Sequence, residues 1–360
     1  MAYRILYVED LNPETKIEEF KLYGYDVEAY KPQSLEHTCN SIVEGHYDAL
    51  VFDYKLTANR EKMANKLFNA PTIAQTLRSM ELTIPIILMS SQKVITEAFD
   101  LDYTSQDLFD FCISKENFSQ DTTKYCKRID AFINAYKIIQ IHSYKLQPIL
   151  NVSPSLFKML DFRLKATFEL PYIKNNVYAI CRFVNYELIR SIGILIGEDV
   201  LSSRLGISKD SEDWSMLIDK LKDYKYHGIL SEVYDRWWWD SIDIWWKTIS
   251  PNRTLRQLSS TERVLIIKKY LGLNKLNPIT PLQYAQSDMF WTICKETHYA
   301  LDPNIDGFDL HIKNIYPWQE KEYVSAYGVL VSNPKILKHL SVVDKQAIKQ
   351  IANNINAGNE

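Results

Sequence analysis

The sequence predicts an α/β fold for residues 1–145, built as a doubly wound five-stranded parallel sheet, followed by a mainly α-helical domain in residues 146–360. Short runs of β-branched and aromatic residues alternate with amphipathic stretches in the first part, which is the rhythm of a parallel sheet covered by helices. After Pro148 helical patterns dominate. A chain of 360 residues is also long enough for two domains.

Five apolar runs are the expected strands of the sheet. Each is short, rich in aliphatic and aromatic residues, and followed by polar residues, as buried parallel strands are. They span residues 3–8, 26–30, 48–53, 84–90 and 108–114. A helix should follow from Tyr125 to Ile139, because its apolar residues recur every three or four positions.

The second half carries helix signals. Apolar residues at helical spacing predict a core-facing helix over 177–195. Ser259 and Glu262 form a capping box before a helix that Gly272 closes, and Ser341 opens a last helix. The best strand candidate of this half is 323–331.

Composition excludes several function classes. With 10 glycines in the chain and no G-x-G, G-K-[ST] or G-x-S-x-G pattern, a dinucleotide fold, a P-loop and a nucleophile elbow are each unsupported. Five scattered cysteines without a C-x-x-C pair predict neither a disulfide framework nor a zinc site. A net charge of -3 and the lack of a basic recognition helix predict no nucleic-acid partner. No apolar run approaches about 18 residues, so we expect no membrane segment and a cytoplasmic protein.

Polar residues follow four of the expected strands at their carboxyl ends. Glu9 and Asp10 end the first, Asp53 the third, Ser90 the fourth and Lys115 the fifth. Parallel strands bring these ends to one edge, where three clustered carboxylates would raise one another's pKa. A divalent cation such as Mg²⁺ would relieve that repulsion, and a carboxylate beside it could accept a phosphoryl group. Lys115 would then neutralise the phosphoryl oxygens and Ser90 would donate a hydrogen bond to one.

This arrangement resembles the receiver domain of bacterial response regulators, a flavodoxin-like fold, over about residues 3–140. The resemblance rests on Val8-Glu9-Asp10, Val51-Phe-Asp53, Leu88-Met-Ser90 and Ile113-Ser-Lys115, in the family's order. It implies that Glu9 and Asp10 bind the metal with Asp53, that Asp53 is the phosphoacceptor, and that Ser90 and Lys115 contact the phosphoryl group. It also implies Mg²⁺ as cofactor and a histidine kinase or phosphotransfer protein as partner. The alternative is a flavodoxin-like sheet whose polar strand ends are incidental caps.

The sequence departs from the family pattern at three places. Glu116 follows the lysine where a proline is common, and Cys112 stands where an aromatic switch is usual. Phe111 is adjacent to Cys112 but should point to the other face of the strand. The residues from Thr57 to Asn65 are an insertion. We therefore expect the phosphorylation chemistry to be retained and its readout to differ.

A tryptophan-rich segment, Trp237 to Trp246, follows in the second half. On a helix, Trp237 and Trp239 would lie about 200° apart, so one buried stripe could not cover all three adjacent tryptophans. The segment is either core and interdomain seam, or a surface for a homodimer or an effector protein.

Together these patterns predict a phosphorelay protein with a helical, non-DNA-binding second domain that serves protein interaction or makes the chain a phosphate sink. Receivers of this kind resemble parts of bacterial defence signalling systems, which suggests an antiviral role. One alternative is a receiver-gated effector enzyme with an unrecognised hydrolase or transferase site in the second domain. Another is a scaffold whose receiver no longer takes phosphate.

Overall fold

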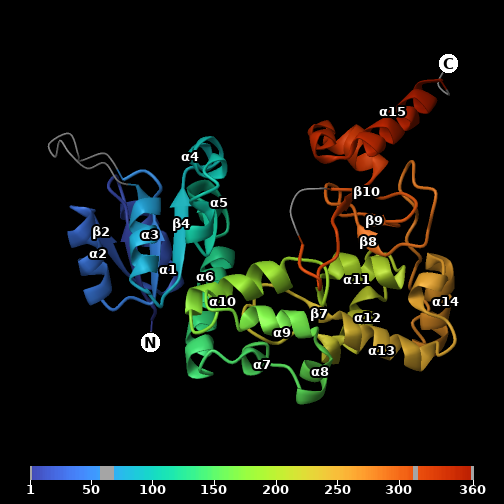
Figure 1. The fold of residues 1–360 in the computed structure, drawn as a ribbon, viewed down its shortest axis with the longest axis horizontal. Helices are drawn as coiled ribbons and strands as arrows, with labels where there is room; N and C mark the ends of the chain where they lie inside the picture. Colours follow the sequence, from blue (N-terminus) through green and yellow to red (C-terminus); the bar gives the residue numbers. More distant parts are fainter. Residues whose placement is uncertain (1, 57–68, 311–314, 358–360) are drawn as a thin grey trace. The chain divides into compact units, whose positions relative to one another are not determined.

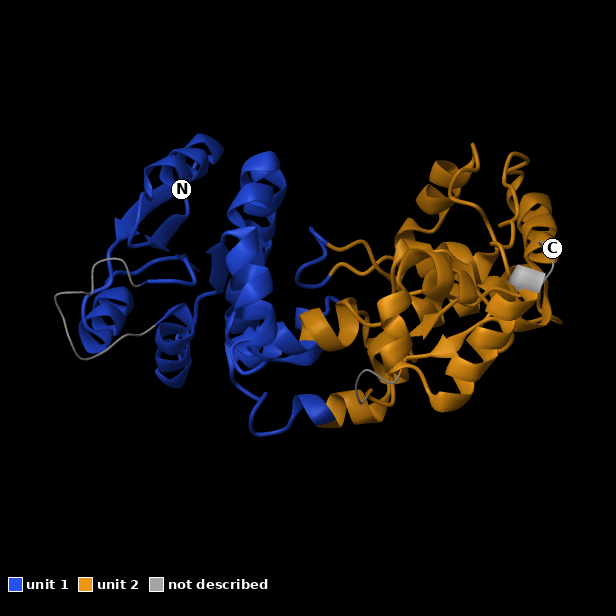
Figure 2. Ribbon diagram, turned by 90° about the horizontal axis from the view of Figure 1, so that it is seen from above, with its two compact units in different colours: residues 1–151, 167–183, 228–233 blue, residues 152–166, 184–227, 234–360 orange. Residues whose placement is uncertain are grey.

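The computed structural model describes residues 2–56, 69–310 and 315–357. The chain forms two compact units, shown in different colours in Figure 2. The first comprises residues 1–151, 167–183 and 228–233, and the second comprises 152–166, 184–227 and 234–360. The units are interleaved along the chain, whereas the sequence predicted a single boundary near residue 145.

The first unit contains a five-stranded, fully parallel sheet in the order β2-β1-β3-β4-β5 (Figure 1). The strands are β1 (Arg4–Val8), β2 (Asp26–Tyr30), β3 (Ala49–Phe52), β4 (Ile86–Ser90) and β5 (Phe111–Ser114). All five expected strands and the predicted α/β class are confirmed. β1, β3 and β4 form completely or almost completely buried runs, as expected for strands covered by helices on both faces.

Alternation along β1 divides the core of this unit between two layers. Leu6 and Val8 belong to the hydrophobic core on one face of the sheet. Tyr7 points to the other face, where its ring packs against Phe20. The helices of this sheet are α1 (Glu14–Tyr23), α2 (Leu35–Glu44), α3 (Ala70–Ser79), α4 (Gln92–Glu97), α5 (Lys115–Gln120) and α6 (Thr122–Ile141). Side-chain caps from Ser34, Ser91 and Ser114 fix where three of them begin.

The first unit also includes a helix that the sequence assigned to the second domain. α10 (Val177–Phe183) packs against α6 (Figure 1). The guanidinium of Arg78 stacks on the Tyr178 ring at 3.7 Å, and Arg182 forms an ion pair with Asp107. The short helices α7 (Leu146–Ile149), α8 (Pro154–Met159) and α9 (Phe162–Phe168) lie between α6 and α10 in the chain.

The second unit is mainly helical, as predicted, and its described residues also form three two-stranded sheets. Its helices are α11 (Glu198–Leu205), α12 (Trp214–Lys220), α13 (Trp239–Ile249), α14 (Ser260–Leu271) and α15 (Val342–Ala357). Its sheets pair β6 (Leu195–Ile196) with β7 (Trp237–Trp238), β8 (Thr292–Ile293) with β9 (Ala300–Leu301), and β10 (Phe308–Asp309) with β11 (Tyr323–Val324). In the described parts of the chain, no helix combines the length and the apolar character that crossing a membrane requires.

In this half of the chain the predicted ends of one helix are correct, whereas the predicted extents of a strand and of another helix are wrong. The capping box of Ser259 and Glu262 and the Gly272 end of α14 are present as predicted. The expected strand over 323–331 is wrong beyond Val324, because the Ser325 hydroxyl accepts the Gly328 N–H and turns the chain into a helical segment. The helix expected over 177–195 ends in a π-helical turn at Val184–Ile189.

The tryptophan segment is part of the core of the second unit. It is a strand followed by a helix, not one helix: Trp237 and Trp238 form β7, and α13 begins at Trp239. A strand sends adjacent side chains to opposite faces, so both tryptophans are buried without a partner protein. Trp239 packs edge-on against Trp291 at 5.2 Å. Burial of Trp237, Trp238, Trp245 and Trp246 in this core removes the geometric argument for a homodimer or effector surface at Trp237–Trp246, and that surface remains without support.

Candidate functional site

The carboxyl edge of the sheet brings the predicted site residues together. Glu9 and Asp10 follow β1, Asp53 follows β3, Ser90 ends β4, and Lys115 begins α5 directly after β5. The register of the parallel strands sets Val8 beside Phe52 and Ser90 beside Ser114, which places these residues on one edge. All the carboxylates among them are buried.

Asp53 is the centre of this cluster. Its Oδ1 accepts a hydrogen bond from the Ser90 hydroxyl at 3.0 Å and lies 2.9 Å from the Lys115 ammonium. Its Oδ2 accepts the backbone N–H of Lys55 at 3.1 Å. Burial raises the pKa of Asp53, and the Glu9 charge raises it further, while Lys115 acts in the opposite direction. Ser90, Lys115 and the Lys55 N–H fix the position of the carboxylate, while burial and the Glu9 charge disfavour its ionised form.

Glu9 is hydrogen-bonded through both carboxylate oxygens. Oε1 accepts the backbone N–H groups of Asp10 and Leu11, each at 3.1 Å. Oε2 accepts the Tyr7 hydroxyl at 3.2 Å and pairs with the Lys115 ammonium. Four donors match the roughly four lone-pair positions of a carboxylate. Glu9 therefore organises the loop after β1 and holds Lys115.

Lys115 is placed by the start of α5. The Ser114 hydroxyl accepts the Asn117 N–H at 3.1 Å and caps that helix, so Lys115 is its first residue. Its ammonium bridges Glu9 and Asp53. Burial alone would lower the pKa of Lys115, but the neighbouring Asp53 and Glu9 outweigh burial and raise it. The group stays charged and neutralises part of the carboxylate cluster.

The fit of a divalent metal depends on these carboxylates. Within residues 2–56, 69–310 and 315–357, no three His, Cys, Asp or Glu side chains are grouped as a ready-made metal site. Glu9 directs both oxygens to other donors, and the Lys115 ammonium supplies the neutralising charge. Asp10 and Asp53 are buried oxygen donors of the kind that Mg²⁺ prefers. The donor chemistry fits the predicted ion, because Glu9, Asp10 and Asp53 all supply buried carboxylate oxygens at this edge of the sheet.

The structure shows the contacts made at the positions where the sequence departs from the receiver pattern. Phe111 packs against Phe132 with ring centroids 5.2 Å apart, while Cys112 is half-buried on the opposite face of β5. Glu116 accepts the Gln92 N–H at 3.0 Å, which ties the start of α5 to the start of α4. The insertion predicted between Thr57 and Asn65 lies outside the described residues.

Tyr7 is the member of the site that was missed in the sequence. The signal was present, because side chains two apart on a strand share a face and Tyr7 precedes Glu9 by two positions. A tyrosine within a buried strand also needs a partner for its hydroxyl.

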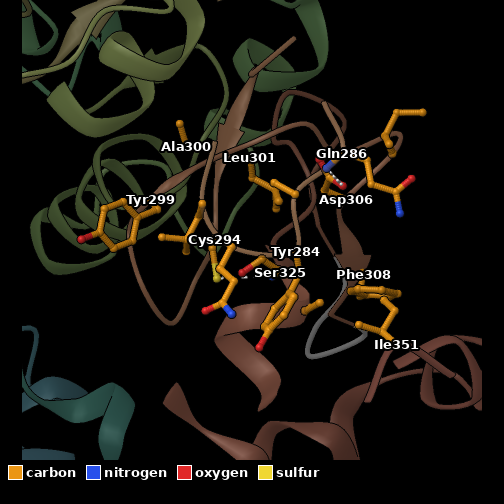
Figure 3. A pocket seen from close by; sticks show the side chains of 15 residues that line it. Tyr284, Gln286, Cys294, Tyr299, Ala300, Leu301, Asp306, Phe308, Ser325 and Ile351 are labelled. Atoms are coloured by element: carbon orange, nitrogen blue, oxygen red, sulfur yellow. Dashed lines mark hydrogen bonds between the residues drawn. The ribbon is translucent and has the colours of Figure 1, made fainter. Parts of the chain in front are cut away.

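The second unit has a pocket of its own, shown in Figure 3, lined by residues that include Tyr284, Cys294, Tyr299 and Ser325. Burial would raise the pKa of Cys294, but hydrogen bonds from Ser325 and Thr297 outweigh it and lower the pKa. The Ser325 N–H lies 3.3 Å from the sulfur. Ser325 and Thr297 therefore act as hydrogen-bond donors to this sulfur.

Comparison with known proteins finds similarity in fold over part of the chain. No protein-family model and no curated protein matches the sequence. The response regulator TrrA of Thermotoga maritima, solved with Mg²⁺ and BeF, is 22% identical with a TM-score of 0.27, covering 35% of this chain and 98% of that one. A CheY-like receiver domain of Methylobacillus flagellatus is 22% identical with a TM-score of 0.28, covering 36% and 99%.

A third similar structure is the receiver domain of a Pseudomonas aeruginosa sensor histidine kinase, solved with a magnesium ion in its active-site cleft. It is 19% identical with a TM-score of 0.29, covering 37% of this chain and 99% of that one. All three similar structures are receiver domains or response regulators, and the similarity is confined to the part of this chain that forms the five-stranded parallel sheet.

Proposed function

We propose that this protein is a response-regulator-like phosphorelay protein that accepts a phosphoryl group on Asp53. The donor would be a histidine kinase or a phosphotransfer protein. One observation carries the proposal: a buried carboxylate at the carboxyl edge of a parallel sheet, in contact with a hydroxyl and an ammonium. Incidental caps would not require the Ser90 hydroxyl and the Lys115 ammonium to meet on the same oxygen of Asp53.

The chemistry is a simple displacement at phosphorus. An Asp53 oxygen forms a bond to phosphorus, the bond from phosphorus to the donor's imidazole nitrogen breaks, and that nitrogen keeps the electron pair. Lys115 and Ser90 already contact Asp53, so their N–H and O–H groups can turn to the phosphoryl oxygens. Asp10 and Asp53 would hold Mg²⁺, which would supply further positive charge to those oxygens.

The second unit would act through protein contacts, or the chain would act as a phosphate sink. The net charge of -3 supports a role without DNA. An antiviral defence role stays a prediction from the resemblance. The alternative of a receiver-gated effector enzyme would use the pocket around Cys294, and new activity that appears only with beryllofluoride would favour it.

The direct test is phosphorylation of the full chain with acetyl phosphate, followed by intact-mass spectrometry. We expect one added phosphate in the presence of Mg²⁺ and much less after chelation with EDTA. Unmodified protein under both conditions would contradict the proposal and favour a scaffold that no longer takes phosphate.

The metal assignment gives a separate prediction. Asp10→Asn should weaken Mg²⁺ binding by about tenfold or more, because it removes a charged oxygen ligand. Titration calorimetry on folded protein measures this, and Asp48→Asn is the matched control, since Asp48 lies at the other end of β3 and pairs with Lys137. Unchanged Mg²⁺ affinity in Asp10→Asn would place the ion elsewhere.

Asp53 should also make stability depend on pH. Because its pKa is raised in the folded chain, the folded state binds this proton more tightly than the unfolded state. Its contribution is therefore full below the unfolded pKa of about 3.9 and is lost as pH rises through the folded pKa. In metal-free buffer, Asp53→Asn should be more stable than wild type at pH 7, with the difference shrinking on acidification. Urea unfolding at several pH values measures this, and a gain that grows on acidification would contradict it.

A further inference from the structure

Tyr7 places a buried hydroxyl directly beneath the site. It lies in the middle of β1 with 0% of its surface exposed, and its ring packs edge-on against Phe20 at 6.2 Å. The hydroxyl donates to Glu9 Oε2 at 3.2 Å. Burial, together with the charges of Glu9 and Asp53, raises the pKa of Tyr7, so the group remains a neutral donor.

The same oxygen of Glu9 also holds Lys115. Glu9 is 3% exposed, so its carboxylate depends on protein donors rather than on solvent. Phosphorylation of Asp53 requires Lys115 to turn toward the new phosphoryl oxygens. When it turns, Glu9 Oε2 keeps one of its two donors, and that donor is Tyr7. A buried carboxylate oxygen left without any donor would oppose the movement.

We propose that Tyr7 is a positioning residue that keeps Glu9 hydrogen-bonded while Lys115 moves from Glu9 to the phosphoryl group on Asp53. This inference rests on the proposed phosphoacceptor function and adds to it how the lysine is released. The Tyr7 hydroxyl donates to the Glu9 oxygen that also holds Lys115, so Tyr7 acts through Glu9 and Lys115.

The variant Tyr7→Phe removes the hydroxyl and keeps the ring against Phe20. We expect the maximal rate of Asp53 phosphorylation by acetyl phosphate to fall by about tenfold, the usual effect of losing one hydrogen bond to a charged group. The concentration of acetyl phosphate that gives half the maximal rate should not change, because Tyr7 does not contact the donor. Tyr25→Phe is the matched control, since its buried hydroxyl contacts Cys126 and Asp130 instead.

A double-variant cycle separates positioning from a structural effect. In Glu9→Gln the lysine is no longer held by a carboxylate, so adding Tyr7→Phe should change the rate less than twofold. A second measurement does not depend on turnover: the rise in melting temperature on adding Mg²⁺ and beryllofluoride should be smaller in Tyr7→Phe than in wild type or Tyr25→Phe.

The outcomes distinguish the two proposals. If wild type takes up no phosphate, the phosphoacceptor function fails and this inference fails with it. If wild type is phosphorylated and Tyr7→Phe matches it in rate and in the beryllofluoride shift, only this inference is overturned. An equal loss in the Glu9→Gln background would also overturn it. Should Tyr7→Phe not fold, Glu9→Gln provides the test, because losing the carboxylate that holds Lys115 should make phosphorylation faster. The phosphorylation rate of each chain is compared with the beryllofluoride shift of the same chain. A ratio in Glu9→Gln no higher than in wild type would contradict the holding of Lys115 by Glu9.

Discussion

Replacing Asp53 by asparagine should abolish phosphate incorporation. The asparagine amide is close in shape to the carboxylate, so the Ser90 hydroxyl and the Lys55 N–H can keep a partner and the sheet should fold. The amide oxygen is a far weaker nucleophile toward phosphorus, because it carries no negative charge. With acetyl phosphate and Mg²⁺, intact-mass spectrometry should show one phosphate on wild type and none on Asp53→Asn.

The control must remove a carboxylate without touching the site. Asp48→Asn does so at the opposite end of the same strand, where Asp48 contacts Lys137 and the Arg4 N–H. This variant should be phosphorylated like wild type. Labelling retained in Asp53→Asn would move the phosphoacceptor to another residue and would leave the Ser90 and Lys115 contacts as structural.

The sheet and its polar edge were predictable because their signals are local. An apolar strand followed at once by a charged residue fixes both the strand and the place of the charge, as Val8-Glu9 and Phe52-Asp53 show. Parallel topology then brings the ends together. The bridging position of Lys115 between Glu9 and Asp53 was not predictable, because it depends on side-chain directions that strand order does not set.

Other features depend on contacts between distant parts of the sequence. The packing of α10 on α6 joins residues that are far apart in the chain, and helical periodicity does not say what a helix packs against. The structure of the tryptophan segment also depends on residues that are distant in the sequence. Its composition indicated a helix, yet pairing with Leu195 and Ile196 made Trp237 and Trp238 a strand. Such pairing has no signal within the segment itself.

Among these variants, Asp110→Ala should lower the free energy of unfolding the most. Asp110 lies directly before β5 and is buried. It accepts hydrogen bonds from Arg78 at 2.9 Å, from the Tyr136 hydroxyl at 2.8 Å and from the Ile86 N–H at 2.8 Å. Asp110→Ala would leave the buried Arg78 charge without its ion pair and Ile86 N–H without an acceptor. We expect the free energy of unfolding to fall by about 3–5 kcal/mol, the usual cost of breaking a buried ion pair from one side.

Urea unfolding of Asp110→Ala measures this, with Asp107→Ala as the matched control. Asp107 pairs with Arg182 at the surface, so its loss should cost less than about 1 kcal/mol. A cost below about 1 kcal/mol for Asp110→Ala would mean that Arg78 is held by its stacking on Tyr178 instead. Because Asp110 lies at the amino end of β5 and Asp53 at the opposite edge of the sheet, the folded fraction of Asp110→Ala should still take up phosphate. Asp110→Ala should therefore lower the free energy of unfolding without abolishing phosphorylation. This is expected if α3, α6 and α10 stabilise the sheet at the end opposite the phosphoacceptor.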